Sequence, residues 1–175
     1  KENMNIQKPE LQGHTIVLRG NFNPSIFQPA WFSAQGLLSQ GKVDTAEIFI
    51  IRPEVAIFTI EWFRLEVTEA RFIIGSTHEA YFERLAELVV NTFRILIHTP
   101  LRMIGVNYDA HFRVKEEAKW HEFGHKLAPK EIWLKVFKNP GMRSLTIEES
   151  VRPDRHKGRI HVKVEPSLKF HPGIY

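Results

Sequence analysis

The segment at residues 46–75 constrains the fold most, because it is almost continuously rich in β-branched and aromatic residues. It reads AEIFIIR, VAIFTIEWFRLEV and ARFIIGS, with breaks at Pro53-Glu54 and Thr68-Glu69 that predict three strands. A parallel crossover needs roughly a dozen residues or more, so strands this close in sequence must pair antiparallel. In WFRLEV, apolar and charged residues alternate, which predicts a strand with one face toward the core and one toward water.

Helical patterns lie on both sides of this β-rich segment. Asn23 and Pro24 have the chemistry of a helix cap and first helical position, and we expect that helix to run to about Ser39 with Pro29 near its first turn. The segment His78–His98 predicts the longest helix. Its apolar stripe consists of Phe82, Leu85, Val89, Phe93 and Leu96, widened by Leu88 and Ile95.

The remaining segments complete an α+β pattern. His14–Gly20 and Leu101–Val114 read as strands, and a helix is expected from about Lys115 to Leu127. Met142–Val151 and Arg159–Glu165 predict a last hairpin. The predicted order is β-α-β-β-β-α-β-α-β-β. This order favours an antiparallel sheet with helices packed on one face.

The length of 175 residues fits one domain. We expect residues 1–13 to be a flexible lead-in and residues 14–175 to form a single α+β domain. Phe170–Tyr175 has the composition of a strand that is beginning, which predicts that the native chain continues beyond Tyr175.

Composition excludes several function classes. The chain has no cysteine, so disulfides, thiolate metal sites and cysteine nucleophiles are excluded. No apolar run approaches the roughly 20 residues of a membrane span, so no membrane partner is expected. A cysteine-free chain without such a run suits the cytoplasm, and we expect a cytoplasmic location.

One short motif points to metal chemistry. His121 to His125 reads H-E-x-x-H, and on a helix residues four apart share a face, so His121 and His125 could bind one zinc ion. Glu122 could then act as general base on metal-bound water. The motif resembles the signature of zincin metallopeptidases, and that resemblance implies zinc as cofactor and peptide hydrolysis as activity.

The surroundings of the motif favour a different interpretation. Lys119 and Lys126 flank it directly, whereas a zincin helix lies buried beneath its sheet. The downstream sequence also lacks the third histidine of the longer zincin signatures. We therefore expect an exposed helix and no cofactor, and keep the zinc-dependent hydrolase as the alternative.

Positive charge is concentrated in the C-terminal third. Residues 130–175 contain 10 Lys and Arg against 5 Asp and Glu, whereas residues 1–129 contain 14 against 15. The densest part is the loop of the last hairpin, where we expect a binding site for anionic groups. Its candidate residues are Arg152, Arg155, His156, Lys157 and Arg159. Nucleic acid or another polyanion is one partner that such a surface could bind.

Two further stretches, Phe63–Phe72 and Leu101–Val114, resemble a family of uncharacterised bacterial proteins. This resemblance implies no activity. Because the chain contains no complete catalytic constellation, we interpret it as a non-enzymatic interaction module with a protein partner, of the kind that serves as a subunit of a larger bacterial assembly. Zinc-dependent hydrolysis and nucleic-acid binding through the basic C-terminal third are the alternatives.

Overall fold

The computed structural model describes residues 8–175 and has the predicted α+β class. Within the described chain, residues group into two compact units. We name Gln12–Asp109 the sheet unit and Ala110–Tyr175 the C-terminal unit, which also includes the N-terminal segment up to Leu11. The prediction of one domain over residues 14–175 stays a prediction. The predicted lead-in lies partly outside the described residues, and its end is ordered, since the first strand begins at Leu11.

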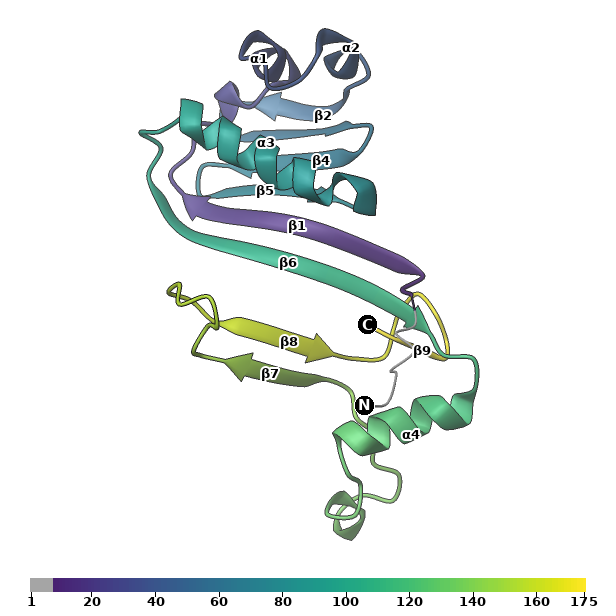
Figure 1. Cartoon of the computed structure of the whole chain (residues 1–175). Coiled ribbons are helices and arrows are strands. Elements are labelled where there is room, and N and C mark those ends of the chain that lie inside the picture. Colours follow the sequence, from purple (N-terminus) through teal and green to yellow (C-terminus); the bar gives the residue numbers. More distant parts are fainter. Residues whose placement is uncertain (1–7) are drawn as a thin grey trace. The chain divides into compact units, whose positions relative to one another are not determined.

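The sheet unit contains six antiparallel strands in the order β2-β3-β4-β5-β1-β6 (Figure 1). They are β1 (Leu11–Gly20), β2 (Glu47–Arg52), β3 (Val55–Ile60), β4 (Phe63–Thr68), β5 (Arg71–Ser76) and β6 (Leu101–Arg113). Its helices are the 3₁₀ turns η1 (Pro24–Ile26) and η2 (Glu79–Tyr81), and the α-helices α1 (Pro29–Ala34), α2 (Gln40–Val43) and α3 (Phe82–Ile95).

The core of this unit lies on one face of the sheet. Alternate side chains of β3, β4 and β5 are buried, including Phe58, Leu65 and Phe72, and α3 packs Leu85 and Val89 into the same cluster. The prediction of helices on one face of an antiparallel sheet is thereby confirmed for this unit. The alternation in WFRLEV is confirmed from Phe63 onward, because Phe63, Leu65 and Val67 are buried while Arg64 is exposed. It is wrong for Trp62, which the pattern places on the wet face and which is buried.

The structure corrects the strand count between residues 46 and 75. The second predicted strand is in fact two, β3 and β4, joined by a tight turn in which Ile60 pairs with Phe63. Glu61 in this turn has a positive φ of 22°. Trp62 is buried against the ring of Tyr81, with centroids 5.1 Å apart, so packing against the start of α3 stabilises the turn.

The helix predicted from Pro24 to Ser39 is also interrupted. Asn23 caps η1 as expected, its side chain accepting a hydrogen bond from the Ser25 backbone N–H at 3.1 Å. Gln28 then adopts an extended conformation with ψ 149°, because the following Pro29 clashes with a helical residue before it. A new helix, α1, begins at Pro29, and Gly36 with φ 69° follows its end.

The C-terminal unit has little buried surface. It contains α4 (Glu117–Leu127), the 3₁₀ turn η3 (Trp133–Lys135), a hairpin of β7 (Leu145–Glu149) and β8 (Ile160–Val164), and the short strand β9 (Gly173–Ile174). The end of β6 pairs with β9, with Arg113 opposite Gly173, so β6 runs through both units. Of the residues from 110 to 175, Gly173 alone is buried.

His14 on β1 makes the stability of the sheet unit depend on pH. Its side chain is buried between Tyr108, stacked at a centroid distance of 4.3 Å, and Phe82, in edge contact at 5.2 Å. Burial lowers the pKa of His14, because the charged ring would lose its hydration. Protonation therefore favours the unfolded chain. The neutral His14 ring therefore makes its full contribution to the stability of the folded chain above the ordinary histidine pKa of 6.5. This contribution is lost as the pH falls below that value.

We expect the His14→Phe variant to lose this acid sensitivity. A single titrating group changes the free energy of unfolding by at most about 1.4 kcal/mol per pH unit. Urea denaturation at pH 7.5 and pH 5 measures the difference for both proteins. The stability lost on acidification should be smaller in the variant than in the original chain, and equal losses would contradict this role of His14.

Candidate functional site

The helix α4 carries the H-E-x-x-H residues on a solvated surface. Charged residues at its two ends interact favourably with the helix dipole, with the acidic Glu117 in the first turn and the basic Lys126 in the last. Ion pairs along the helix join Lys119 to Glu116 at 2.6 Å and Lys126 to Glu122 at 2.7 Å. None of its residues is buried, as the sequence predicted for an exposed helix.

Each of the two motif histidines lies beside a different carboxylate. The Nε2 atom of His121 is 3.8 Å from Glu117, and that of His125 is 2.9 Å from Glu131. Both imidazole side chains are about half exposed, at 57% and 46%. Between residues 8 and 175, no group of three His, Asp or Glu side chains is placed to hold a metal ion. The part of the chain that the structure describes thus offers the two imidazoles no third protein ligand for zinc.

Glu122 is paired with a lysine on the exposed surface of α4. The ammonium of Lys126 donates a hydrogen bond to its carboxylate and lowers the pKa of Glu122. A carboxylate with a lowered pKa is a weaker base. The ion pair therefore stabilises the charged form of Glu122 on the helix surface.

Beside α4 lies a cavity of about 460 Å³, which we call the α4 pocket. Its walls come from α4, the segment between η3 and β7, the end of β8, and β9. The large apolar side chains of the lining, prolines apart, are Trp120, Phe123, Leu134, Met142, Val164 and Ile174. Its polar lining includes His121, Lys130, Lys138 and Glu165. This volume falls within the range of roughly 300–1,000 Å³ that is typical of small-molecule sites.

Trp120 fixes one wall of the α4 pocket. Its indole Nε1 donates a hydrogen bond to the Gly173 carbonyl at 2.9 Å, and its ring meets His171 edge-on at 5.4 Å. Gly173 has to be glycine, because a Cβ there would lie 2.8 Å from the Phe170 carbonyl and 3.0 Å from the Phe112 carbonyl. The contact between α4 and β9 therefore holds the indole in place before any ligand arrives.

At the α4 pocket the carboxylate has a partner of opposite charge, whereas two ammonium groups have none among the described residues. Glu165 lies 2.6 Å from Lys163 and is thereby neutralised. The ammonium groups of Lys130 and Lys138 form no hydrogen bond or ion pair with any residue that the structure describes. The pocket thus has an apolar interior and two cations that are available to a ligand.

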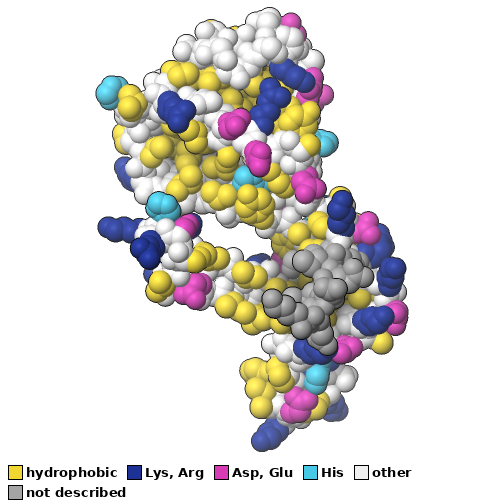
Figure 2. All heavy atoms as spheres, in the orientation of Figure 1, with side chains coloured by type: hydrophobic (Ala, Val, Ile, Leu, Met, Phe, Trp, Pro, Cys, Tyr) yellow, Lys and Arg dark blue, Asp and Glu magenta, His cyan; other side chains and the backbone are white. Residues whose placement is uncertain are grey.

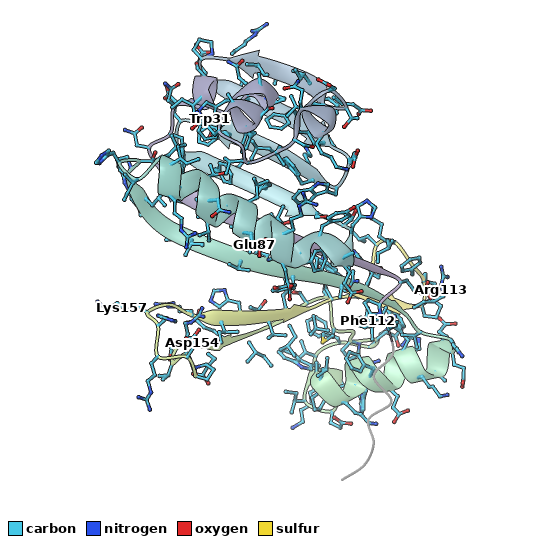
Figure 3. The ribbon with its side chains drawn as sticks, turned by 45° about the horizontal axis from the view of Figure 1, so that its top comes forward. Trp31, Glu87, Phe112, Arg113, Asp154 and Lys157 are labelled. Atoms are coloured by element: carbon cyan, nitrogen blue, oxygen red, sulfur yellow. The ribbon has the colours of Figure 1, made fainter. Side chains whose placement is uncertain are left out.

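The basic hairpin loop, the second predicted site, is partly neutralised by its own acids. Figure 2 shows Lys and Arg side chains at this end of the hairpin, and Figure 3 places Asp154 and Lys157 on the loop. Arg152 donates two hydrogen bonds to Asp154, one of them at 2.9 Å, and this pairing lowers the pKa of Asp154. Arg159 lies 3.0 Å from Glu148.

The remaining candidates of the loop are less constrained. The side chains of Arg155 and Lys157 form no hydrogen bond or ion pair within the described part of the chain, whereas His156 interacts electrostatically with Asp154. The backbone N–H of His156 donates to Asp154 at 3.1 Å, which shapes the loop. The hairpin therefore offers fewer free cations than its composition predicted.

The apolar edge of β6 is a candidate surface that the sequence did not reveal. The side chains of Met103, Ile104 and Tyr108 are 67%, 64% and 70% exposed, and Leu101 and Val106 are exposed as well. Figure 2 shows hydrophobic side chains on the surface at this strand. The sequence analysis predicted a strand at Leu101–Val114 but did not predict that its apolar side chains form an exposed surface.

Comparison with known proteins found no match. No family model matches it. Likewise, no curated protein and no solved structure is similar to it. Among residues 8–175, no helix has the length and apolar character needed to cross a membrane. The function therefore has to be argued from the surfaces described above.

Proposed function

We propose that this protein is a non-enzymatic interaction module that binds an extended polypeptide segment along the edge of β6. The observation that supports the proposal is a long, apolar and unpaired strand edge. β1 pairs with one edge of β6. Just before the start of β6, the Asn21 N–H donates a hydrogen bond to the Pro100 carbonyl at 3.0 Å. Within residues 12–109, no strand pairs with the other edge.

The side chains of β6 favour a partner strand over water. Successive residues of a strand point to opposite faces, so the neighbours Met103 and Ile104 expose apolar groups on both faces of the sheet. Strands that are apolar on both faces are typical of sheet interiors. An added strand would complete the hydrogen bonds of the edge, and its side chains would cover part of this apolar surface.

Between the charged residues Arg102 and Asp109, the edge also lacks the features that natural proteins use to prevent strand pairing. Such edges carry proline, charged side chains or bulges. From Met103 to Tyr108 the sequence is MIGVNY, which contains neither proline nor charge. A subunit of a larger assembly would use an unprotected edge of this kind to engage its neighbour.

A photo-cross-linking side chain at position 106 tests the proposal in the natural host. The same group at Ala34, an exposed position on α1, is the control. We expect a polypeptide to be captured at position 106 and not at position 34. Addition of the captured segment to the purified protein should then slow the amide hydrogen exchange of Ile104–Tyr108.

We expect Val106→Lys to weaken that binding by at least about tenfold, because a lysine on the edge opposes strand pairing. Val151→Lys is the matched control, since Val151 is 76% exposed on the hairpin of the C-terminal unit. Isothermal titration with the captured segment measures both. The proposal is wrong if the two variants bind equally well, or if the segment protects amides elsewhere and leaves β6 unchanged.

A further inference from the structure

We infer that the α4 pocket is a binding site for an amphipathic carboxylate, a molecule with an elongated apolar tail and one anionic head, such as a medium-chain fatty acid. The site lies within the C-terminal unit and is independent of the edge of β6. Its ligand class follows from the lining of the pocket, its two free cations and a second cavity that adjoins it.

The lining of the pocket selects an apolar ligand body. Six of the side chains that form its walls are large and apolar, and Trp120 is held in place by its hydrogen bond to Gly173. Moving apolar surface from water into such a site stabilises the complex in proportion to the area that is buried. The lining includes few groups that could recognise the polar edges of a sugar or a nucleobase.

The lysines select the charge of the ligand. Lys130 and Lys138 line the pocket and have no carboxylate partner among the described side chains. The acidic residue of the lining, Glu165, is already paired with Lys163. An anionic head is therefore favoured, and a cationic head would meet two uncompensated ammonium groups.

A second cavity gives the ligand its length. It has a volume of about 490 Å³ and is lined by Trp133 and Phe137. Both cavities are lined by Lys130 and Met142, so they adjoin at these residues. A flexible tail that fills the α4 pocket can extend past Met142 into this second space, whereas a compact aromatic acid would occupy one cavity only.

The experiment compares three ligands that share a ten-carbon tail: decanoate, decanol and decyltrimethylammonium, each below its micelle concentration. Isothermal titration measures binding to the whole chain. We expect decanoate to bind at least about fivefold more tightly than decanol, as expected for one or two exposed ion pairs. Decyltrimethylammonium should bind most weakly. Equal affinities for the three ligands would overturn the inference, because non-specific apolar adsorption does not distinguish the head group.

Variants locate the site. Lys130→Gln and Lys138→Gln should each weaken decanoate binding and leave decanol binding unchanged, whereas Lys157→Gln on the hairpin loop should alter neither. Gly124→Met should abolish binding of both, because Gly124 lines the pocket and a Cβ there meets no atom within 4 Å, leaving room for a side chain that fills the space. Gly124→Ala is the control for the change in helix propensity. If Gly124→Met does not fold, the lysine variants decide, and unchanged decanoate binding in both would refute the site.

Discussion

Replacing Phe72 by alanine should destabilise the sheet unit by about 3–5 kcal/mol, as expected when a fully buried phenylalanine is truncated. Phe72 is 1% exposed. Its ring centroid lies 5.2 Å from that of Phe93, 5.4 Å from that of Phe27 and 6.2 Å from that of Phe22. The truncation would leave a cavity where β5, α3 and the segment around η1 meet. Domains are typically stable by only about 5–15 kcal/mol, so the loss is a large share of the total.

Urea unfolding followed by tryptophan fluorescence measures this loss, because Trp31 and Trp62 both belong to the sheet unit. Phe49→Ala is the matched control. Phe49 is 60% exposed, and the guanidinium of Arg64 lies 4.8 Å from its ring centroid. That variant should lose less than about 1 kcal/mol. Similar losses for the two variants would show that the aromatic cluster is not the centre of the core.

A single methyl group at Gly20 should cost the sheet unit about 2–4 kcal/mol. A Cβ at this position would lie 2.3 Å from the carbonyl oxygen of Pro100 and 3.0 Å from the ring of Phe22. The first of these atoms belongs to the backbone just before β6, and the neighbouring Asn21 N–H donates a hydrogen bond to it at 3.0 Å. Gly20→Ala would therefore push apart the end of β1 and the start of β6.

Gly41→Ala tests whether this cost arises from the close approach and not from the loss of a glycine. A Cβ at Gly41 meets no atom within 4 Å, and the residue lies in α2. Alanine is the better helix former, so stability should be unchanged or rise by up to about 1 kcal/mol. Amide hydrogen exchange of β1 and β6 reports the difference at residue level. A Gly20→Ala protein with undisturbed exchange would contradict the geometry at this glycine.

The parts of the fold that follow a simple period were predictable from the sequence. The stripe of α3 places Leu85 and Val89 in the core because a 3.6-residue period on one side of a helix specifies a single buried face. β4 was equally clear, since its alternation assigns Leu65 to the core and Arg64 to water. In both cases the local pattern and the tertiary environment require the same orientation.

The turn between β3 and β4 was not predictable, because its cause lies far away in sequence. Glu61-Trp62 has no glycine or asparagine to signal a hairpin. The turn is stabilised by Trp62, which packs on Tyr81 and lies beneath the guanidinium of Arg84, 5.5 Å from the ring centroid. Both partners come from the region where α3 begins, about 20 residues further along the chain.

The candidate site was predicted in part. The sequence placed His121, Glu122 and His125 on an exposed helix, and α4 has these properties. The pocket beside that helix has walls from segments as distant as Phe123 and Ile174, and no local pattern indicates their meeting. Spacing within the basic loop likewise gave no sign that Arg152 is paired with Asp154.

The course of β6 has a consequence for synthesis on the ribosome. The C-terminal unit combines residues before β1 with the end of β6, since the Glu10 N–H donates a hydrogen bond to the His111 carbonyl at 2.8 Å. A nascent chain can complete the sheet unit once Asp109 has emerged, and domains tend to fold in the order in which they are made. The backbone N–H of Glu10, before β1, then has no partner until His111 has been synthesised. The speed of translation just after Asp109 therefore determines how long this N–H stays unpaired.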